Sequence, residues 1–133
     1  MGMTIKTKYS IGQKIFYITI DIEQNKLKII ESFINCIEID KDNSINYIAP
    51  IEKNDPNKHI SSIIFSTKEE LFDTYGDAEF VVNIIDKHIK EKYNTLENFF
   101  NLKDIADVDK LKIIIDLVKQ ENRKLYKGIN EDG

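Results

Sequence analysis

The sequence predicts an α+β fold, because the spacing of its apolar residues changes once along the chain. Up to Ser66, apolar residues gather in short segments rich in β-branched and aromatic side chains with a two-residue repeat, as they do in strands. After Ser66 they recur at three- and four-residue steps, as in amphipathic helices. Strands and helices that occupy separate blocks indicate an α+β domain rather than an alternating α/β one. With 133 residues, of which 41% are apolar, the chain can bury one core.

Residues 14–22 and 27–40 predict a β-hairpin. Both segments are rich in β-branched and aromatic residues, and the polar turn 23–26 separates them. Because side chains alternate along a strand, the first segment has two distinct faces. We expect one face to carry Phe16, Ile18, Ile20 and Ile22, and the other to carry Tyr17, Thr19 and Asp21.

The second of these segments is apolar on both faces. This pattern is typical either of a central strand in a sandwich or of a strand that bends around a small barrel, and a barrel would need a bend or bulge near residues 31–32. A turn at 40–44 leads to a third predicted strand at 45–51. A fourth strand is predicted at 59–66, after the polar loop 52–58.

The first helical signal is a capping box, with Thr67 as the N-cap and Glu70 three residues later. We expect a short helix that passes through Tyr75 and ends at Gly76, because glycine suits the left-handed stop. The next helix is expected to begin at Asp77. Its apolar stripe consists of Phe80, Val81, Ile84, Ile85, His88 and Ile89.

Two further helices are predicted near the end of the chain. Thr95 is expected to cap a short one and Asp107 to begin the last one. Residues from 127 onward are polar, and we expect them to be disordered. The apolar stripe of the last helix consists of Val108, Leu111, Ile114, Ile115, Leu117, Val118 and Leu125.

Three segments resemble small SH3-like barrel proteins that are common in bacteriophages and low-GC bacteria. Residues 9–18 (YSIGQKIFYI) resemble their opening motif, 45–48 (INYI) their third strand, and 64–71 (IFSTKEEL) their closing strand-to-helix junction. The resemblance covers about residues 9–72 and implies a five-stranded or nearly five-stranded barrel with a binding role. It supplies no catalytic residues, and residues 77–126 depart from the short members of that group.

The combined prediction is a small SH3-like antiparallel β-barrel followed by a C-terminal helical extension. Residues 1–8 are expected to be a flexible N-terminus and 9–66 the barrel. Residues 67–126 are expected to form the helical extension, packed on the barrel or on a partner, and 127–133 a disordered tail.

Charge and composition limit the possible partners. The net charge is −4, and acids outnumber bases over residues 31–107, so the chain lacks a strongly basic nucleic-acid footprint. There is one cysteine, Cys36, which suggests a reducing compartment. Neither a membrane-spanning apolar run nor a signal peptide is evident, and we expect a cytoplasmic protein that does not contact a membrane.

Known site chemistry is mostly missing from the sequence. Zinc needs three or four ligands, whereas the chain has only His59, His88 and Cys36. We expect His88 to be packed or half-buried and Cys36 to be inert within its strand. Residues 40–44 start like a calcium loop, but the sixth and twelfth positions are Ile45 and Ile51. We therefore expect no metal, no cofactor and no catalytic residues.

Two charged segments are candidate binding sites. One is an acidic run that serves either as helix capping or as a docking patch for a protein partner: Glu69, Glu70, Asp73, Asp77 and Glu79. The other is a set of lysines and tyrosines that either contacts nucleic acid or protects sheet edges from aggregation: Lys8, Tyr9, Lys14, Tyr17, Lys26 and Lys28.

The last helix offers a third candidate surface. Its stripe is expected to pack on the sheet or on the preceding helix. If the barrel fills its own core, the stripe over residues 108–125 is surplus and would be buried in a homodimer or against a partner.

These observations predict a non-enzymatic protein-interaction module. By analogy with small acidic phage proteins, such a module would be a phage or mobile-element accessory protein that inhibits a host-defence or nucleic-acid-processing complex, as anti-CRISPR proteins do. Nucleic-acid binding through the lysine and tyrosine face is the alternative.

Overall fold

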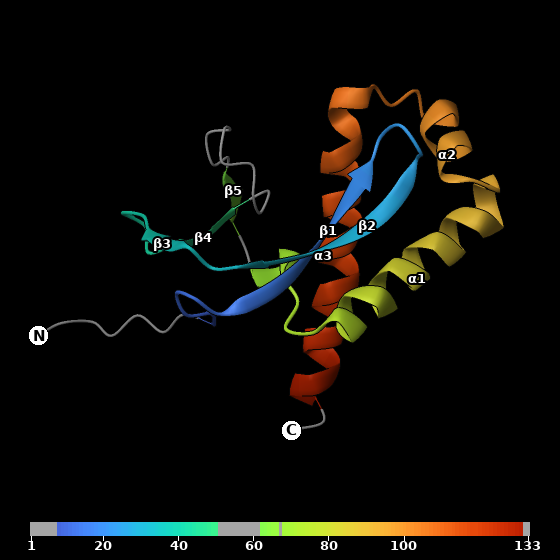
Figure 1. The fold of residues 1–133 in the computed structure, drawn as a ribbon. Coiled ribbons are helices and arrows are strands. Elements are labelled where there is room, and N and C mark those ends of the chain that lie inside the picture. Colours follow the sequence, from blue (N-terminus) through green and yellow to red (C-terminus); the bar gives the residue numbers. More distant parts are fainter. Residues whose placement is uncertain (1–7, 51–61, 67, 132–133) are drawn as a thin grey trace, which may run out of the picture.

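The computed structural model describes residues 8–50, 62–66 and 68–131, with side chains up to residue 125. Within this part of the chain the fold is α+β, as predicted: five strands form two antiparallel sheets, and three α-helices follow (Figure 1). The elements are β1 (Lys14–Asp21), β2 (Lys26–Phe33), β3 (Cys36–Ile39), β4 (Ile45–Pro50), β5 (Ser62–Phe65), the 3₁₀ helix η1 (Lys68–Glu70), α1 (Tyr75–Tyr93), α2 (Leu96–Leu102) and α3 (Asp107–Glu131).

Strands β1 and β2 form the predicted hairpin. Their register runs from the pair Lys14 and Phe33 to the pair Asp21 and Lys26. At the turn, an Asp21 carboxylate oxygen accepts the Gln24 N–H at 3.2 Å, and Asn25 takes the left-handed conformation with φ 48°. Asparagine tolerates this conformation better than most residues, so the polar turn residues set the hairpin geometry.

The long second segment breaks at residues 34–35, after the 31–32 position at which a barrel would need a bend or bulge. Ile34 still pairs with the first sheet, because its N–H donates to the Gln13 carbonyl at 2.9 Å and its carbonyl accepts the Gly12 N–H at 2.7 Å. Gly12 has φ 88°, which favours glycine. The next residue, Asn35, donates its N–H to the Ile48 carbonyl of β4 at 2.8 Å. The chain therefore changes sheets within one residue.

The second sheet has the order β3-β4-β5, and every neighbouring pair is antiparallel. The described residues contain a two-stranded and a three-stranded sheet and no closed barrel. A hydrogen bond links the sheets where the buried Ser32 hydroxyl donates to the Pro50 carbonyl at 3.0 Å. The fourth predicted strand is β5, which covers Ser62–Phe65, while Ile51, the loop 52–58 and residues 59–61 lie outside the described part.

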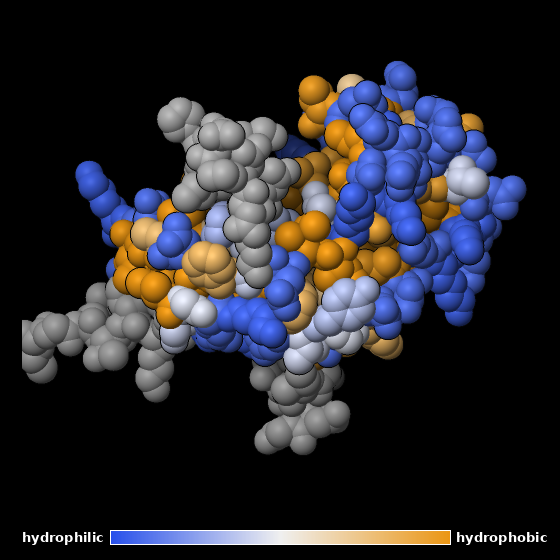
Figure 2. Space-filling model, viewed as in Figure 1, coloured by the Kyte–Doolittle hydropathy of each residue, from blue (hydrophilic) through white to orange (hydrophobic). Residues whose placement is uncertain are grey.

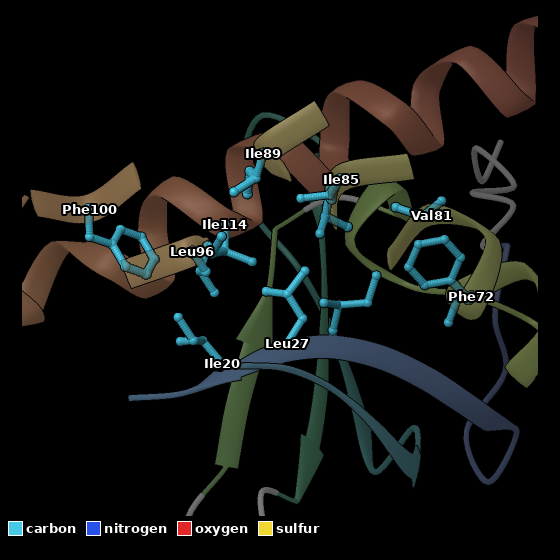
Figure 3. Close-up of a cluster of buried hydrophobic side chains, with 12 residues drawn as sticks. Ile20, Leu27, Phe72, Val81, Ile85, Ile89, Leu96, Phe100 and Ile114 are labelled. Carbon is cyan, nitrogen blue, oxygen red and sulfur yellow. The ribbon is translucent and has the colours of Figure 1, made fainter. Parts of the chain in front are cut away.

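Strand β1 is buried on both faces and so contributes to two cores. Ile18 and Ile20 point toward the helices, whereas Ile15 and Tyr17 point toward the second sheet. The face that carries Phe16, Ile18 and Ile20 was predicted correctly, but Ile22 is 42% exposed and Tyr17 is buried. The larger core, shown in part in Figure 3, consists of Ile18, Ile20, Leu27, Phe72, Ala78, Val81, Ile85, Ile89, Leu96, Phe100, Ile114 and Val118. The smaller core consists of Tyr9, Ile15, Tyr17, Ile34, Tyr47, Ala49, Phe65 and Leu71.

The junction between strands and helices differs from the prediction. Thr67, the expected N-cap, lies outside the described residues, and the expected short α-helix is the 3₁₀ turn η1. Phe72 then adopts an extended conformation and exchanges two backbone hydrogen bonds of 2.9 Å with Phe16 of β1. Burying the Phe72 ring in the larger core keeps this segment extended, and a local helix pattern cannot reveal that contact.

Helix α1 begins before the residues that were expected to separate two helices. Thr74 is its N-cap, and the Thr74 hydroxyl accepts the Asp77 N–H at 3.1 Å. Gly76 is therefore inside the first turn of α1 and is not a helix stop, and Asp77 is not the cap. The core contacts come from Ala78, Val81, Ile85 and Ile89, while Phe80 is 52% exposed.

The remaining helix starts were predicted correctly. The Thr95 hydroxyl caps α2 by accepting the Asn98 N–H at 3.0 Å, and α3 begins at Asp107. Helix α3 continues to Glu131, so the expected disordered tail is helical over residues 127–131. Of the predicted stripe, Ile114 and Val118 are buried, whereas Val108 is 87% exposed.

A polar side chain in the stripe of α3 anchors the junction. Asn122 is only 4% exposed, and its amide nitrogen donates to the Glu69 carbonyl at 2.8 Å and to the Leu71 carbonyl at 3.0 Å. These bonds join α3 to the segment that pairs with β1. An asparagine in an apolar stripe is the sequence signal that identifies such an anchor.

Replacing Ile114 tests the larger core. We expect Ile114→Ala to lower the free energy of unfolding by about 2–5 kcal/mol, because it leaves a cavity among side chains from the hairpin and the helices. The exposed Val108 on the same helix provides a matched control, and Val108→Ala should change stability by less than about 0.5 kcal/mol. Urea unfolding followed by circular dichroism measures both. Equal effects of the two substitutions would contradict this assignment of the core.

Replacing Asn122 tests the anchor. We expect Asn122→Ala to lower the free energy of unfolding by about 1–3 kcal/mol, because two carbonyl groups lose their donor. The exposed Gln120→Ala on the same helix is the control for amide removal. Amide hydrogen exchange should show the Phe72 N–H exchanging faster in the Asn122 variant only. Unchanged protection of that amide would mean that Asn122 does not hold the segment.

Candidate functional site

The outer face of the three-stranded sheet carries an apolar row that no described helix or strand covers. The register places Cys36 of β3 opposite Ile48 of β4, and Ile48 opposite Ile64 of β5. The neighbouring row points inward, because Tyr47 and Phe65 belong to the smaller core, and side chains alternate along strands. Ile64 is 59% exposed and Cys36 is exposed, while Ile48 is half-buried. Figure 2 shows apolar surface at this end of the molecule.

The edge of this sheet is formed by β3, which pairs with β4 on one side. Among the described residues, no strand pairs with the other side of β3. Ile39, at the end of β3, is 48% exposed. Exposed backbone N–H and C=O groups beside apolar side chains form a template to which another strand can add.

The turn between β3 and β4 surrounds this edge with negative charge. The Ser44 hydroxyl donates to Asp42 at 2.7 Å and to Asp40 at 3.2 Å, and the Asn46 amide donates to Asp40 at 3.1 Å. The hydrogen bond from the Ser44 hydroxyl lowers the pKa of Asp42, with a smaller contribution from the Ser44 N–H. Asp42 is therefore a carboxylate at neutral pH, and Asp40 and Glu38 are two further acidic residues at this edge.

The predicted acidic run is divided among several internal roles. Glu69 accepts two hydrogen bonds from Arg123, and Glu70 is buried, 3.4 Å from the Ser66 hydroxyl. Asp73 forms an ion pair with Lys8 at 3.7 Å, and Asp77 lies in the first turn of α1. Glu79 is exposed. Only part of the run is therefore exposed, which weakens the docking-patch interpretation relative to capping and ion pairing.

The predicted lysine and tyrosine face has no exposed aromatic side chains. Tyr9 is 0% exposed and Tyr17 is 4% exposed, and both pack in the smaller core. Base stacking needs an open ring face, so neither ring forms the exposed aromatic platform that the nucleic-acid alternative calls for. Lys14 pairs with Glu31 at 3.5 Å, Lys28 pairs with Asp21 at 3.3 Å, and Lys26 is exposed.

Two residues considered as possible ligands lie on the surface. His88 is exposed and not packed, because the core contacts of α1 come from residues on another side of the helix. Cys36 is exposed, since it belongs to the outer row of β3, and it is therefore not inert core packing. His59 lies outside the described residues. Across the part of the chain that the structure describes, no three His, Cys, Asp or Glu side chains gather closely enough to hold a metal ion.

The apolar stripe of α3 is not a free dimer surface. Ile114 and Val118 belong to the larger core, and Leu111, Leu117 and Leu125 pack against it. The surplus stripe that motivated a homodimer through residues 108–125 is thus mostly buried within one chain. Val108 remains exposed at the start of the helix.

Sequence reasoning missed both the apolar outer row and Asn122. A partial signal was present in the second segment. Ile30, Ile34 and Cys36 occupy even-numbered positions, and the odd-numbered positions also carry apolar residues. This alternation identifies two apolar faces of the segment, but it does not show that the helices cover only the hairpin.

Comparison with known protein families, with characterised proteins and with solved structures finds no match for this chain. Within the described residues, no helix combines the length and the apolar character needed to cross a membrane.

The ion pair between Glu69 and Arg123 predicts a pH dependence of stability. Arg123 donates to Glu69 at 2.8 and 3.2 Å, and these hydrogen bonds lower the pKa of Glu69 in the folded state. A lowered pKa stabilises the fold above the usual glutamate range, and this contribution disappears as pH falls through the folded-state pKa.

We therefore expect Arg123→Gln to lower the urea midpoint at pH 7 by a small amount, because the arginine is exposed. The difference from the wild type should shrink steadily below pH 4. Lys112→Gln removes one positive charge from the same helix and is the control. Its difference in urea midpoint from the wild type should not shrink below pH 4. A constant difference down to pH 2 would show that the pair does not account for the effect.

Proposed function

We propose that this chain is a non-enzymatic protein-interaction module that docks through the outer face and free edge of the β3-β4-β5 sheet. The observation that carries the proposal is the apolar row Cys36, Ile48 and Ile64, whose last member is 59% exposed. The partner that fits is an extended segment with apolar side chains at alternate positions and basic residues beside them.

The geometry of the row supports a strand as the partner. A strand added beside β3 would satisfy the exposed backbone groups of that edge, and its side chains on one face would extend the row of Cys36 and Ile48. Main-chain hydrogen bonds would supply affinity, and the apolar row would select the side chains. A helix would leave the edge groups of β3 without partners.

Charge supports a basic partner. Glu38, Asp40 and Asp42 surround the edge, with Lys41 as the only base in the turn. Complementary charge raises the rate of association and disfavours acidic competitors. An acidic rim around an apolar row therefore favours a segment that carries lysine or arginine at its ends.

The finer proposal is that the two sheets derive from an SH3-like barrel and that the partner belongs to a host-defence or nucleic-acid-processing complex. The resemblance of residues 9–72 to phage-associated SH3-like proteins supports both points. The direct passage from β2 to β3 at residues 34–35, which joins the two sheets, is compatible with an opened barrel. Such complexes have basic surfaces wherever they contact nucleic acid, and the acidic rim complements them.

Selection from a peptide library tests the docking face. We expect the wild-type protein to enrich peptides with alternating apolar residues and basic flanks, with micromolar dissociation constants. Ile64→Asp should weaken binding of these peptides at least tenfold, because it places a charge in the apolar row. Backbone amide shifts on binding should be largest for residues of β3.

Leu102→Asp is the matched control, because Leu102 is 72% exposed but lies at the end of α2. It should leave peptide binding within about twofold of the wild type. Loss of binding in both variants, or amide shifts confined to the helices, would contradict the proposal. If the wild-type protein is a dimer and Ile64→Asp makes it monomeric, the strand that docks on this face comes from a second copy of this chain and not from another protein.

A further inference from the structure

We propose that a groove between α1, α2 and α3 binds a small amphipathic carboxylate. This second site lies among the helices. The β3-β4-β5 sheet is at the other end of the molecule in Figure 1. The groove has a volume of about 340 Å³. Its occupant is a free small molecule with an apolar body and one negatively charged end.

The floor of the groove is apolar and comes from all three helices. Helices α1 and α3 spread apart toward α2 in Figure 1, and the groove lies between them. The side chains of Ile85 and Ile89 serve both the larger core and the groove, so the floor is fixed by core packing. The other apolar lining residues are Tyr93, Phe99 and Leu117.

The rings in the floor are held in place by each other. Tyr93 and Phe99 meet edge to face with centroids 5.1 Å apart, and Phe99 also contacts Phe100 at 5.4 Å. Phe100 is 1% exposed in the larger core. The floor is therefore preorganised, which lowers the entropic cost of binding an apolar body.

The rim carries unpaired positive charge. Lys92 lies in the last turn of α1 and Lys103 is the C-cap of α2, and both line the groove. Within the described part of the chain, neither lysine has an ion-pair partner. Two acids also line the rim, but Glu121 is already paired with Lys124 at 3.1 Å, which leaves Glu91 alone against the two lysines.

The size of the groove favours a small molecule over a protein segment and sets the size of the ligand. A dry apolar cavity of about 150 Å³ holds a benzene molecule, so the groove holds roughly a dozen carbon atoms. This is less than a helix or a strand needs. A straight-chain or aromatic carboxylate of that size would place its body on the floor, with its carboxylate between Lys92 and Lys103.

Titration with sodium decanoate, below its micelle concentration, tests the site. We expect saturable binding by calorimetry, with chemical-shift changes at the methyl groups of Ile85, Ile89 and Leu117. Decanol has the same apolar body without the charge, and it should bind at least about tenfold more weakly. Equal affinity for decanol, or no saturable binding of decanoate, would overturn the proposal.

Charge reversal separates the rim from general electrostatics. The double variant Lys92→Glu and Lys103→Glu should weaken decanoate binding at least about tenfold. The double variant Lys87→Glu and Lys112→Glu has the same net charge, with both lysines exposed on α1 and α3 outside the groove, and should bind within about twofold of the wild type. Circular dichroism confirms that both variants fold. Equal losses in the two variants would show that net charge, and not the groove, governs binding.

Discussion

The structure depends on the burial of β1 on both faces. Ile15 and Tyr17 belong to one core and Ile18 and Ile20 to the other, so a slip by one residue would exchange the two sets. Strand β1 is also paired on both edges, with β2 along one side and with Phe72 on the other. Because both faces of β1 are buried, the positions of the other elements are fixed. The helices must cover one face, and β4 and β5 must cover the other.

Local signals in the sequence were sufficient wherever local interactions determine the structure. The hairpin, the cap at Thr95 and the start of α3 were predicted correctly, because a polar turn, a capping hydroxyl and an acidic first turn act within a few residues. The junction was predicted wrongly for the opposite reason. Phe72 is extended because it pairs with Phe16 and is buried under α1, and these contacts join residues that are distant in the sequence.

The candidate sites show the same division. The acidic run was recognised as charge, but its partners Arg123 and Lys8 come from the two ends of the chain and could not be inferred from the run itself. Tyr17 looked like an exposed aromatic residue because its strand alternates, yet the second sheet covers that face. The helix groove had no signal at all, since it depends on the angle at which α1 and α3 separate and not on any pattern within one helix.

The proposed docking face follows from a shortage of covering elements. The three helices pack on the hairpin, and the inner face of the β3-β4-β5 sheet packs on β1, so the described chain has no element left for the outer face. An uncovered sheet edge is an aggregation hazard that charged residues normally limit. Here Glu38 and Asp40 flank the edge while Ile64 stays apolar and exposed. Charges that only protected the edge would not need an apolar row beside them, whereas a site for a basic, strand-forming partner needs both.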